Sequence, residues 1–554
     1  MSRSRRAGAG APLLTALLVW LVCYPIAITL SDALGAPDWT LRHFSEFVRR
    51  PDEWGALWAS LWISLATVAL AAAIGVPLAF LFERAEFPGR RVLGALVALP
   101  VVLPPLVGVV AFLFLYGESG FLSRAVQAAL RLEAPPWRLA GPGAILLVHA
   151  YSMYVYFYLF TRAGLSRLDG AYLEAARSLG AGSARTLRRV TLPLLAPALS
   201  AAALLTFMTS LASFSAPYIF GGTFRVLTTQ ILFSRLNGDV AMAMVETSVL
   251  AAVALLGLFL LQRGEARARP GAGGGVRGIS PSRRRLGVSR YAVALASALA
   301  AGFLLLPHAT LLLVSLVPGG TWTNQAVPPV LNLSNYRSLV AEPERLRPIA
   351  NSLWMAAVST AAALAVGFLG AWLAVTRRTR LRSWLEALIA MPWALPGTVF
   401  VVALAATFSR NAPWAGRFVL VGTAAILPLA YFVRSLPLTG RAAFAGLRRL
   451  DPALEEAAAS LGAGAWRRLR RVTLPLLRPA LAAGASLAFL TALGDFVVSV
   501  VLYTFETRPI SIEILSSLRM QEMGAAAAYG VLLAALSATA FFLFGRSDAP
   551  VGGG

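Results

Sequence analysis

The sequence predicts an all-α protein that crosses a membrane many times, and three observations indicate this fold class. Of its 554 residues, 58% are hydrophobic and only 13% are charged, which is unlike the composition of soluble globular proteins. Apolar runs of about 18 residues or more, long enough to cross a bilayer as helices, recur along the whole chain. The runs lack the short alternating segments of a membrane β-barrel. We therefore expect a polytopic protein with about 12 spanning helices.

Six of the expected spans precede residue 263. The first, with the basic start MSRSRR, looks like a signal peptide. Its apolar run is too long for one, however, and more spans follow, so an uncleaved first helix is favoured. The six runs are 11–31, 56–82, 93–116, 142–161, 192–214 and 243–262.

The segment 263–290 separates these spans from the rest of the chain. It is rich in Gly, Pro and Arg and has almost no apolar periodicity, which predicts a flexible cytoplasmic linker. We expect one membrane domain at 1–262, a second at 291–546 and a short tail at 547–554. The second domain has six further runs, at 291–317, 349–375, 384–408, 417–433, 475–501 and 524–545.

The two halves resemble each other in sequence. Residues 60–80 match 352–372 in type, and LPVVLPP at 99–105 matches MPWALPG at 391–397, both at an offset of 292. The loop 117–141 is longer than its counterpart 409–416. Because six spans return the chain to the side where it began, the halves form a parallel repeat, unlike the inverted repeats of many secondary transporters.

The net charge of +24 follows the expected topology. With the N-terminus inside, the segments on its side carry 33 Arg against 10 acidic residues, and the opposite face carries 15 Arg against 13. An excess of basic residues marks the cytoplasmic side, so both termini are predicted to be cytoplasmic, and a nucleic-acid-binding surface is disfavoured. The Arg-rich segments are 1–10, 83–91, 162–190, 263–290, 376–386, 434–471 and 546–554.

One polar, Arg-rich loop occurs twice. Residues 171–199 and 453–481 are identical at 22 of 29 positions, at a constant offset of 282. Asp169 and Asp451 are suited to cap the start of a short helix, and Gly180 and Gly462 are suited to end it. Nothing in bilayer chemistry requires a polar loop to be duplicated, so the repeat predicts that two copies of one partner are bound.

The repeated loop resembles the EAA loop of ABC importer permeases. That pattern is Glu-Ala-Ala, three residues, Gly, nine residues, an aliphatic residue, one residue and Leu-Pro. Both copies fit it, at 169–193 and 451–475. The matching residues are Glu174, Ala175, Ala176, Gly180, Val190, Leu192 and Pro193, then Glu456, Ala457, Ala458, Gly462, Val472, Leu474 and Pro475.

The resemblance implies a fold, partners and a substrate class. In that family the loop is a coupling helix seated in a groove of the ATPase subunit, and the fold is that of type I, MetI-like permeases. Two fused copies look like the ferric-iron importer type, and 213–231 looks most like permeases for iron(III). Thiamine, phosphonate (2-aminoethylphosphonate) and polyamine importers are the alternatives. The implied partners are two ATPase subunits and an external substrate-binding protein, with the chain in a bacterial inner membrane.

The composition limits the chemistry of the chain itself. All 49 basic residues are Arg, and a P-loop needs a Lys, so ATP and Mg²⁺ are expected on the partner ATPase and no catalytic residue here. Cys23 is the only cysteine, which excludes an internal disulfide or a Cys-based metal site, and we expect no cofactor. A secondary transporter working alone and a membrane-embedded enzyme are the rival classes.

A few residues within the spans are candidates for the pore or its gate. A carboxylate in the bilayer is costly, so Asp495 either faces the substrate path or is a structural group bonded to helix ends or an Arg. Its counterpart at the offset of 282 is Ser213. Pro104 and Pro396 break two spans and are either gate hinges or simple kinks. His149 is expected to serve packing or a hydrogen bond rather than metal binding, and the neighbouring Tyr residues line a path or form an interfacial belt.

Overall fold

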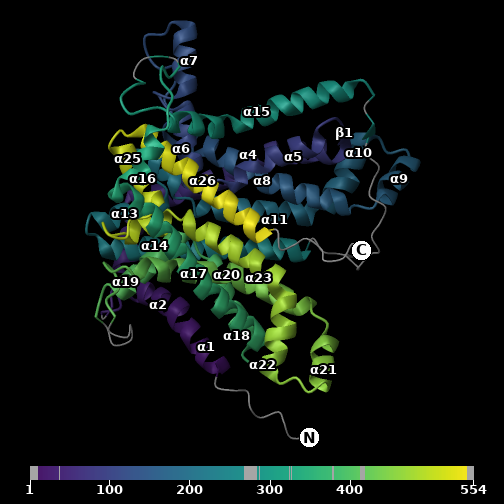
Figure 1. Ribbon diagram of the computed structural model, residues 1–554, viewed down its shortest axis with the longest axis vertical. Coiled ribbons are helices and arrows are strands. Elements are labelled where there is room, and N and C mark those ends of the chain that lie inside the picture. The colour runs from purple at the N-terminus through teal and green to yellow at the C-terminus, as the bar shows by residue number, and fades with distance from the viewer. Residues whose placement is uncertain are drawn as a thin grey trace. The chain divides into compact units, whose positions relative to one another are not determined.

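The computed structural model of the protein (Figure 1) describes residues 10–36, 38–267, 284–285, 287–322, 325, 327–376, 380–411 and 418–545. Most of the predicted linker and the whole predicted tail lie outside these residues. The chain divides into two compact units. Unit 1 comprises Met1–Glu46, Ser234–Ser248 and Asn332–Gly554, and unit 2 comprises Phe47–Phe233 and Val249–Leu331.

The regular secondary structure of the described residues is helical apart from one very short strand pair, so the all-α prediction is confirmed. Strands β1 (Ala85–Glu86) and β2 (Arg284–Arg285) pair in parallel within unit 2. The helices of unit 2 are α4 (Pro51–Arg84), α5 (Arg90–Ala98), α6 (Pro105–Tyr116), α7 (Phe121–Leu130), α8 (Gly141–Arg167), α9 (Gly170–Ser178), α10 (Ser183–Thr186), α11 (Leu192–Leu211), α12 (Ser215–Phe220) and α15 (Ser289–Ser315).

Unit 1 repeats this series, mainly with helices from the second half of the sequence. Its helices are α1 (Gly10–Leu18), α2 (Tyr24–Ala33), α16 (Ser334–Ala341), α17 (Pro343–Thr376), α18 (Arg382–Ala390), α19 (Gly397–Phe408), α20 (Ile426–Arg449), α21 (Pro452–Ser460), α22 (Ala465–Arg468), α23 (Leu474–Leu493), α24 (Val497–Leu502), α25 (Ile510–Arg519) and α26 (Met523–Gly545). Three helices have residues in both units: α3 (Arg42–Arg49), α13 (Leu227–Leu236) and α14 (Val240–Arg267).

The number of spans is slightly smaller than the twelve predicted. Among the described residues, ten helices are long and apolar enough to cross a membrane, or eleven if a bent pair is one span. That pair, Arg382–Trp393 with Gly397–Phe408, bends by 104° at the predicted break beside Pro396. The run predicted at 417–433 corresponds to α20, which is absent from the ten because Arg434 and Arg441 make it more polar than the other spans.

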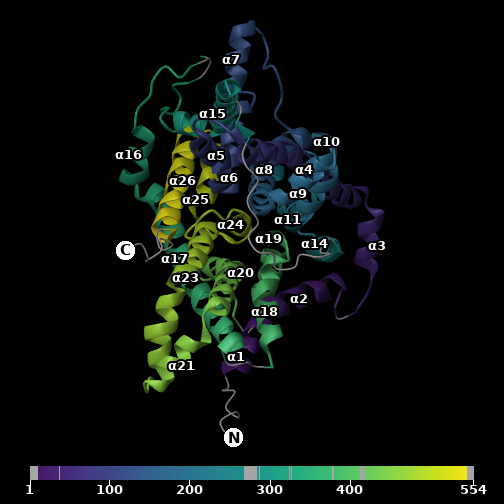
Figure 2. The ribbon, with the colours of Figure 1, turned by 90° about the vertical axis from the view of Figure 1, so that its right-hand side faces the viewer.

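Glycines bring the long helices into close contact at equivalent places of the two units. A Cβ on Gly75 of α4 would lie 2.3 Å from the backbone O of Tyr154 in α8. A Cβ on Gly367 of α17 would lie 2.9 Å from the backbone N of Gly440 in α20. Gly75 and Gly367 are related by the offset of 292. The duplication seen in the sequence is therefore also a duplication of helix packing, with α4, α8 and α11 forming one bundle (Figure 2) and α17, α20 and α23 the other.

Each unit contains the first span of the other half of the sequence. In unit 1, α1 lies beside α18 (Figure 2) and α2 packs on α19. Asp32 of the first span pairs with Arg410 at 3.1 Å, and Trp20 meets Phe408 edge to face at 5.8 Å. In unit 2, α15 packs on α5 and α6. Membership of a compact unit therefore does not follow chain order for these two spans.

The Tyr residues of α8 hold neighbouring helices together. Tyr154 and Tyr158 are fully buried, and their hydroxyl groups donate to the carbonyl oxygens of Val97 at 2.5 Å and Gly94 at 3.0 Å. Both acceptors lie in α5. Both side chains are buried among helices, so the interfacial belt, one of the two alternatives left open by the sequence, does not apply to these two residues. A buried Tyr hydroxyl needs such an acceptor, and the end of α5 supplies one.

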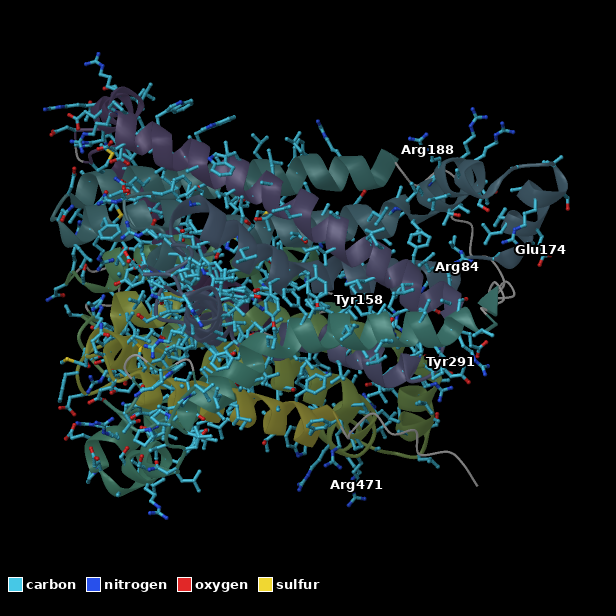
Figure 3. All side chains as sticks on the ribbon, turned by 90° about the horizontal axis from the view of Figure 1, so that it is seen from above. Arg84, Tyr158, Glu174, Arg188, Tyr291 and Arg471 are labelled. Atoms are coloured by element: carbon cyan, nitrogen blue, oxygen red, sulfur yellow. The ribbon has the colours of Figure 1, made fainter. Side chains whose placement is uncertain are left out.

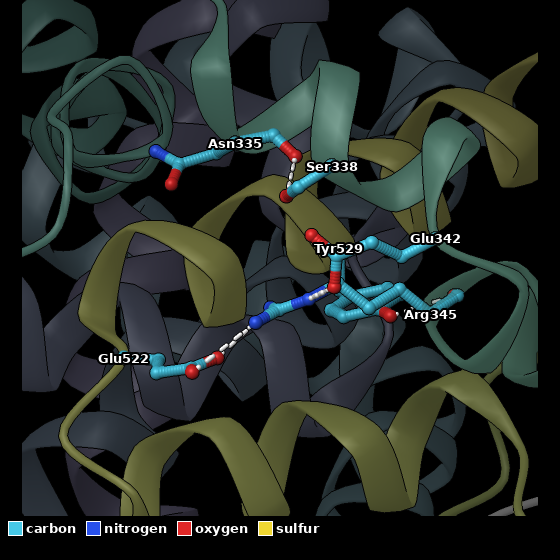
Figure 4. A network of polar contacts seen from close by, with 6 residues as sticks. All are labelled: Asn335, Ser338, Glu342, Arg345, Glu522 and Tyr529. Atoms are coloured by element: carbon cyan, nitrogen blue, oxygen red, sulfur yellow. Dashed lines mark hydrogen bonds and ion pairs between the residues drawn. The ribbon is translucent and has the colours of Figure 1, made fainter.

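A polar network fixes the start of α17 in unit 1 (Figure 4). The guanidinium of Arg345 donates to Glu522 at 2.9 and 3.2 Å and to Glu342 at 2.7 Å. The Tyr529 hydroxyl donates to the carbonyl oxygen of Arg345 at 2.7 Å. Bidentate Arg–carboxylate pairs are among the stronger hydrogen-bonded pairs, so this network ties α17 to the beginning of α26.

Candidate coupling loops and polar contacts of the spans

The first half of the repeated loop is a short, capped helix in both units. Helix α9 begins after Asp169, whose Oδ1 accepts from the N–H of Ala171 at 3.0 Å. Helix α21 begins after Asp451, whose Oδ1 accepts from the N–H of Ala453 at 2.9 Å. These are the N-caps that the sequence predicts. Such a cap satisfies one of the amide groups that a helix start leaves unpaired.

The end of each short helix depends on a glycine. Gly180 and Gly462 have φ values of +76° and +78°, a left-handed conformation that glycine adopts without steric cost. The N–H of Ala181 then reaches the carbonyl of Ala176, and the N–H of Ala463 reaches that of Ala458, each at 3.0 Å. This is a Schellman motif. No atom lies within 4 Å of a Cβ at either glycine, so the requirement is conformational rather than one of space.

The two loops expose the same side chains. Glu174, Ala175, Glu456 and Ala457 are exposed, and Ala176 and Ala458 are partly buried. In Figure 3, Glu174 and Arg188 lie at the end of unit 2 where Figure 1 places α9, α10 and β1. Each capped helix therefore has an exposed surface that consists of small residues and one carboxylate.

One exposed residue pair escaped the sequence reasoning. Leu179 and Leu461, directly before the glycines, are 87% and 88% exposed. A single exposed apolar side chain is common on a protein surface, but here the same residue type has the same exposure at the equivalent position of both loops. The signal in the sequence was an apolar residue next to the helix-ending Gly in both copies. These two Leu residues extend the surface formed by the Glu-Ala-Ala residues.

Each loop joins its span through a π-helical turn. Residues Leu187–Thr191 and Leu469–Thr473 are π turns that run directly into α11 and α23, where Pro193 and Pro475 lie in the first turn. Such turns contain an extra residue and are often found at functional sites. The sequence analysis expected a helix here but not this irregularity, because nothing in the residue types marks it.

The loops differ in how they are fastened. In the second loop, the Thr473 hydroxyl donates to Oε1 of Glu455 at 2.7 Å. The residue that corresponds to Glu455 in the first loop is Leu173, which is buried. One loop is therefore held by a hydrogen bond across the π turn and the other by apolar packing.

Asp495 lies in the break between α23 and α24. Its Oδ2 lies 2.6 Å from Nη1 of Arg434 in α20, and its Oδ1 accepts from the N–H of Val498 at 2.8 Å. The side chain of Asp495 is 5% exposed and that of Arg434 is 25% exposed. Asp495 therefore has both partners of the structural alternative, an Arg and a helix end, and its role in a substrate path stays a prediction.

Pro396 and Gly397 lie beside this ion pair. Pro396 precedes α19, and a Cβ on Gly397 would lie 2.6 Å from Nη1 of Arg434. The missing side chain at Gly397 leaves room for the guanidinium. The fold therefore brings together Pro396, Arg434 and Asp495, which are far apart in the sequence.

Ser213 occupies the equivalent break in unit 2, between α11 and α12, and contacts His149. The Oγ of Ser213 lies 2.8 Å from Nε2 of His149, whose Nδ1 lies 3.3 Å from Oγ1 of Thr67 and 3.2 Å from Oγ of Ser210. His149 is buried with both ring nitrogens in hydrogen-bond distance of a hydroxyl. Among the described residues, no group of three or more His, Cys, Asp or Glu could hold a metal ion. Pro104 is the residue directly before α6.

Comparison with known proteins identifies relatives that match both halves of the chain. Residues 71–269 and 366–551 match the family described as "Binding-protein-dependent transport system inner membrane component". A probable ABC transporter permease of Sinorhizobium fredii, y4fN, is 30% identical over 90% of this chain and 89% of its own length. The ferric transport system permease FbpB of Actinobacillus pleuropneumoniae is 29% identical to this chain. The match covers 78% of this chain and 62% of the length of FbpB.

A permease that matches a smaller part of the chain and a solved structure are also similar. The molybdenum transport permease ModB of Mycobacterium bovis is 32% identical over 40% of this chain and 83% of its own length. A bacterial ABC transporter that imports alginate aligns with 47% of this chain and 97% of its own chain, at 17% identity and a TM-score of 0.38. With the family matched once in each half, the chain belongs to the inner membrane permease subunits of binding-protein-dependent ABC importers.

Proposed function

We propose that this chain supplies both permease halves of an ABC importer and that each half binds one ATPase subunit through its EAA loop. The duplicated loop carries the proposal, because both copies present the same capped helix and the same exposed residues. Two equal docking surfaces fit a pair of identical ATPases. The loops face the cytoplasm, both termini lie on that side, and a substrate-binding protein delivers cargo to the opposite face.

The proposed contact is made by the short helix and the residue before its glycine. Small residues at Ala175 and Ala457 allow close approach of a partner backbone, and Leu179 and Leu461 fill apolar pockets on it. Glu174 and Glu456 bind the partner and transmit its motion; they are not catalytic acids. ATP and Mg²⁺ bind to the ATPase, and its closure moves both loops together, which switches the spans between inward and outward openings.

Replacement of the loop residues tests this proposal. Leu179→Ser and Leu461→Ser together should abolish co-purification of the ATPase, whereas each single variant should retain one subunit or bind both more weakly. Gly180→Val and Gly462→Val should act in the same way, because the left-handed backbone is then strained. Exposed Leu130→Ser, in α7 and outside both loops, is the control. Normal assembly and transport in the double Leu variant would refute the proposal.

We propose iron(III) as the cargo. Relatives described as ferric transport permeases, at 29% and 28% identity, match 78% and 74% of the chain, so the likeness extends across both halves. The relatives described as molybdenum and sulfate permeases match about 40%. The test is ATP hydrolysis by the reconstituted importer with its own binding protein. Stimulation by ferric but not by molybdate or sulfate would support iron, and stimulation by an oxyanion would replace it.

A further inference from the structure

An apolar groove runs along the membrane-spanning part of unit 2, between α4, α8 and α11. Its volume is about 670 Å³. Its lining consists mainly of small residues of α4 and of residues of α8 and α11. They include Ala69, Ala72, Ala73, Phe157, Leu192 and Leu199. The lining contains a single hydroxyl, that of Ser200, so a polar solute has almost nothing to bind there.

The length of the groove along α4 is close to the thickness of one bilayer leaflet. It extends from Val68 to Pro77 along α4, which at 1.5 Å per residue is about 14 Å. Half of a hydrocarbon core of about 30 Å is about 15 Å. Both α4 and the helix containing α11 are among the membrane spans. An acyl chain lying along α4 would therefore fit the groove from the membrane centre to the headgroup region.

The end of the groove is cationic. Arg84 follows Pro77 by seven residues in the same helix, which places it near the groove-facing side of α4. Arg188 lies in the π turn that leads into Leu192. Figure 3 shows both at the same end of unit 2. Arg177 of α9 is close enough to repel Arg84, and the neighbouring Glu83 attracts it. Within the part of the chain that the structure describes, no carboxylate pairs with Arg188 or Arg189.

The second half lacks this combination. At the offset of 292, Leu364, Phe368 and Leu369 replace the smaller Ala72, Val76 and Pro77, and Thr376 replaces Arg84. Gly75 and Gly367 pack equivalently in the two units, so these positions correspond in space as well as in sequence. The groove is therefore a feature of one half of an otherwise duplicated framework.

We infer that the groove binds one anionic phospholipid of the cytoplasmic leaflet. An acyl chain lies over Ala69, Ala72 and Ala73, and the headgroup phosphate is bound by Arg84, Arg188 and Arg189. Basic pockets between spanning helices on the cytoplasmic side bind anionic headgroups in this way. The inference rests on the inward orientation proposed above and goes beyond it, because it assigns a lipid to the helix next to the first coupling loop.

Lipid binding to the purified full-length chain tests the inference. A phosphatidylglycerol with a photoreactive acyl chain should label peptides from 68–84 and 187–203, and a phosphatidylcholine with the same chain should not. Arg188→Gln with Arg189→Gln should weaken phosphatidylglycerol binding roughly 25-fold, at about fivefold for each Arg. The matched control is Arg470→Gln with Arg471→Gln, the equivalent residues of the second half, which should bind the lipid normally.

A second variant tests the groove rather than the charge. Ala72→Leu introduces the residue of the second half and should remove the labelling of 68–84 while the ATPase still co-purifies. Equal labelling by both lipids, no labelling at these peptides, or equal weakening by the two Arg pairs would overturn the inference. The double variant Leu179→Ser and Leu461→Ser distinguishes the two proposals. It should lose ATPase binding, which tests the proposed function, while lipid labelling, which tests the groove, stays intact.

Discussion

At the scale of single residues, the most informative contact is the pair formed by Asp495 and Arg434. A carboxylate that is nearly buried in a span is stable only with a partner, and Arg434 and the N–H of Val498 are its partners. The other unit has Ser213 and His149 in the equivalent place. Two different polar contacts thus connect the fourth span of each half to the break after its fifth.

Removal of one partner should be costly. We expect Asp495→Asn to lower the free energy of unfolding by about 3–5 kcal/mol, because Arg434 is left partly buried and uncompensated. Glu386→Gln, which breaks the exposed pair with Arg448, should cost less than about 1 kcal/mol. Thermal unfolding of the purified variants in detergent measures both. Equal stability of the two variants would show that Asp495 is compensated in some other way.

The same pair separates a structural role from a transport role. Arg434→Met with Asp495→Leu should recover most of the lost stability, because no charge is left unpaired. If Asp495 also lines the substrate path, the other alternative left open by the sequence, transport by this double variant stays low while its stability is normal. Recovery of both stability and transport would leave Asp495 a purely structural role.

At the scale of elements, the close crossings of α4 with α8 and of α17 with α20 determine how each bundle packs. Helices approach this closely only where side chains are absent, and Gly75 and Gly367 provide those places. The π turns are the second repeated device, since each places an extra residue between a coupling loop and its span.

A single methyl group should disturb the first crossing. Gly75→Ala should reduce the yield of folded protein and its unfolding temperature, because the Cβ would overlap the backbone of Tyr154. Gly55→Ala, in the same helix but with nothing within 4 Å of its Cβ, should be neutral or stabilise by up to about 1 kcal/mol. Size-exclusion profiles and melting curves of the pair give the comparison. Similar behaviour of both variants would mean that α4 shifts to accommodate the methyl group.

Shortening a π turn should uncouple a loop from its span. Deletion of Val190 would restore ordinary helical pairing and rotate the first coupling loop by about 100° relative to α11. We expect the protein to insert and fold but to lose transport, and to bind the ATPase at one loop only. The corresponding deletion of Val472 should affect the other loop. Normal transport in either deletion variant would exclude a role for the π turn in coupling.

At the scale of the whole molecule, the exchange of first spans makes the two halves depend on each other. The first span packs in unit 1 through Asp32 and Trp20. Helix α15 packs in unit 2, where the Tyr151 hydroxyl donates to the carbonyl of Leu304 at 2.7 Å. Neither sequence half therefore contains all the helices of a compact unit.

Separate expression of the halves measures this dependence. Residues 1–262 expressed alone should be degraded or aggregate, because α15 is missing from their unit. Co-expression with 291–554 should restore a stable complex even without the linker. Pull-down of one half by a tag on the other, followed by melting of the complex, gives the readout. A stable, monodisperse first half by itself would contradict the expected exchange.

The sequence by itself determined the fold class, the duplication, the loop helices and their caps. These depend on composition and on residues close together in the chain: Asp169 and Ala171, or Arg177 and Gly180, are near neighbours. The family relation also follows from local spacing. The roles assigned to the loop residues and the domain boundaries remain predictions.

Only the tertiary structure decided which distant groups meet. The sequence places Arg434 in the Arg-rich cytoplasmic segment 434–471. In the structure it lies within α20 and pairs with the carboxylate of Asp495, 61 positions away. The sequence also did not show the partner of His149, the burial of Tyr154 and Tyr158, or the unit in which each first span packs. Partners of buried groups are selected by packing geometry in a low-dielectric interior, and residue types along the chain do not encode that geometry locally.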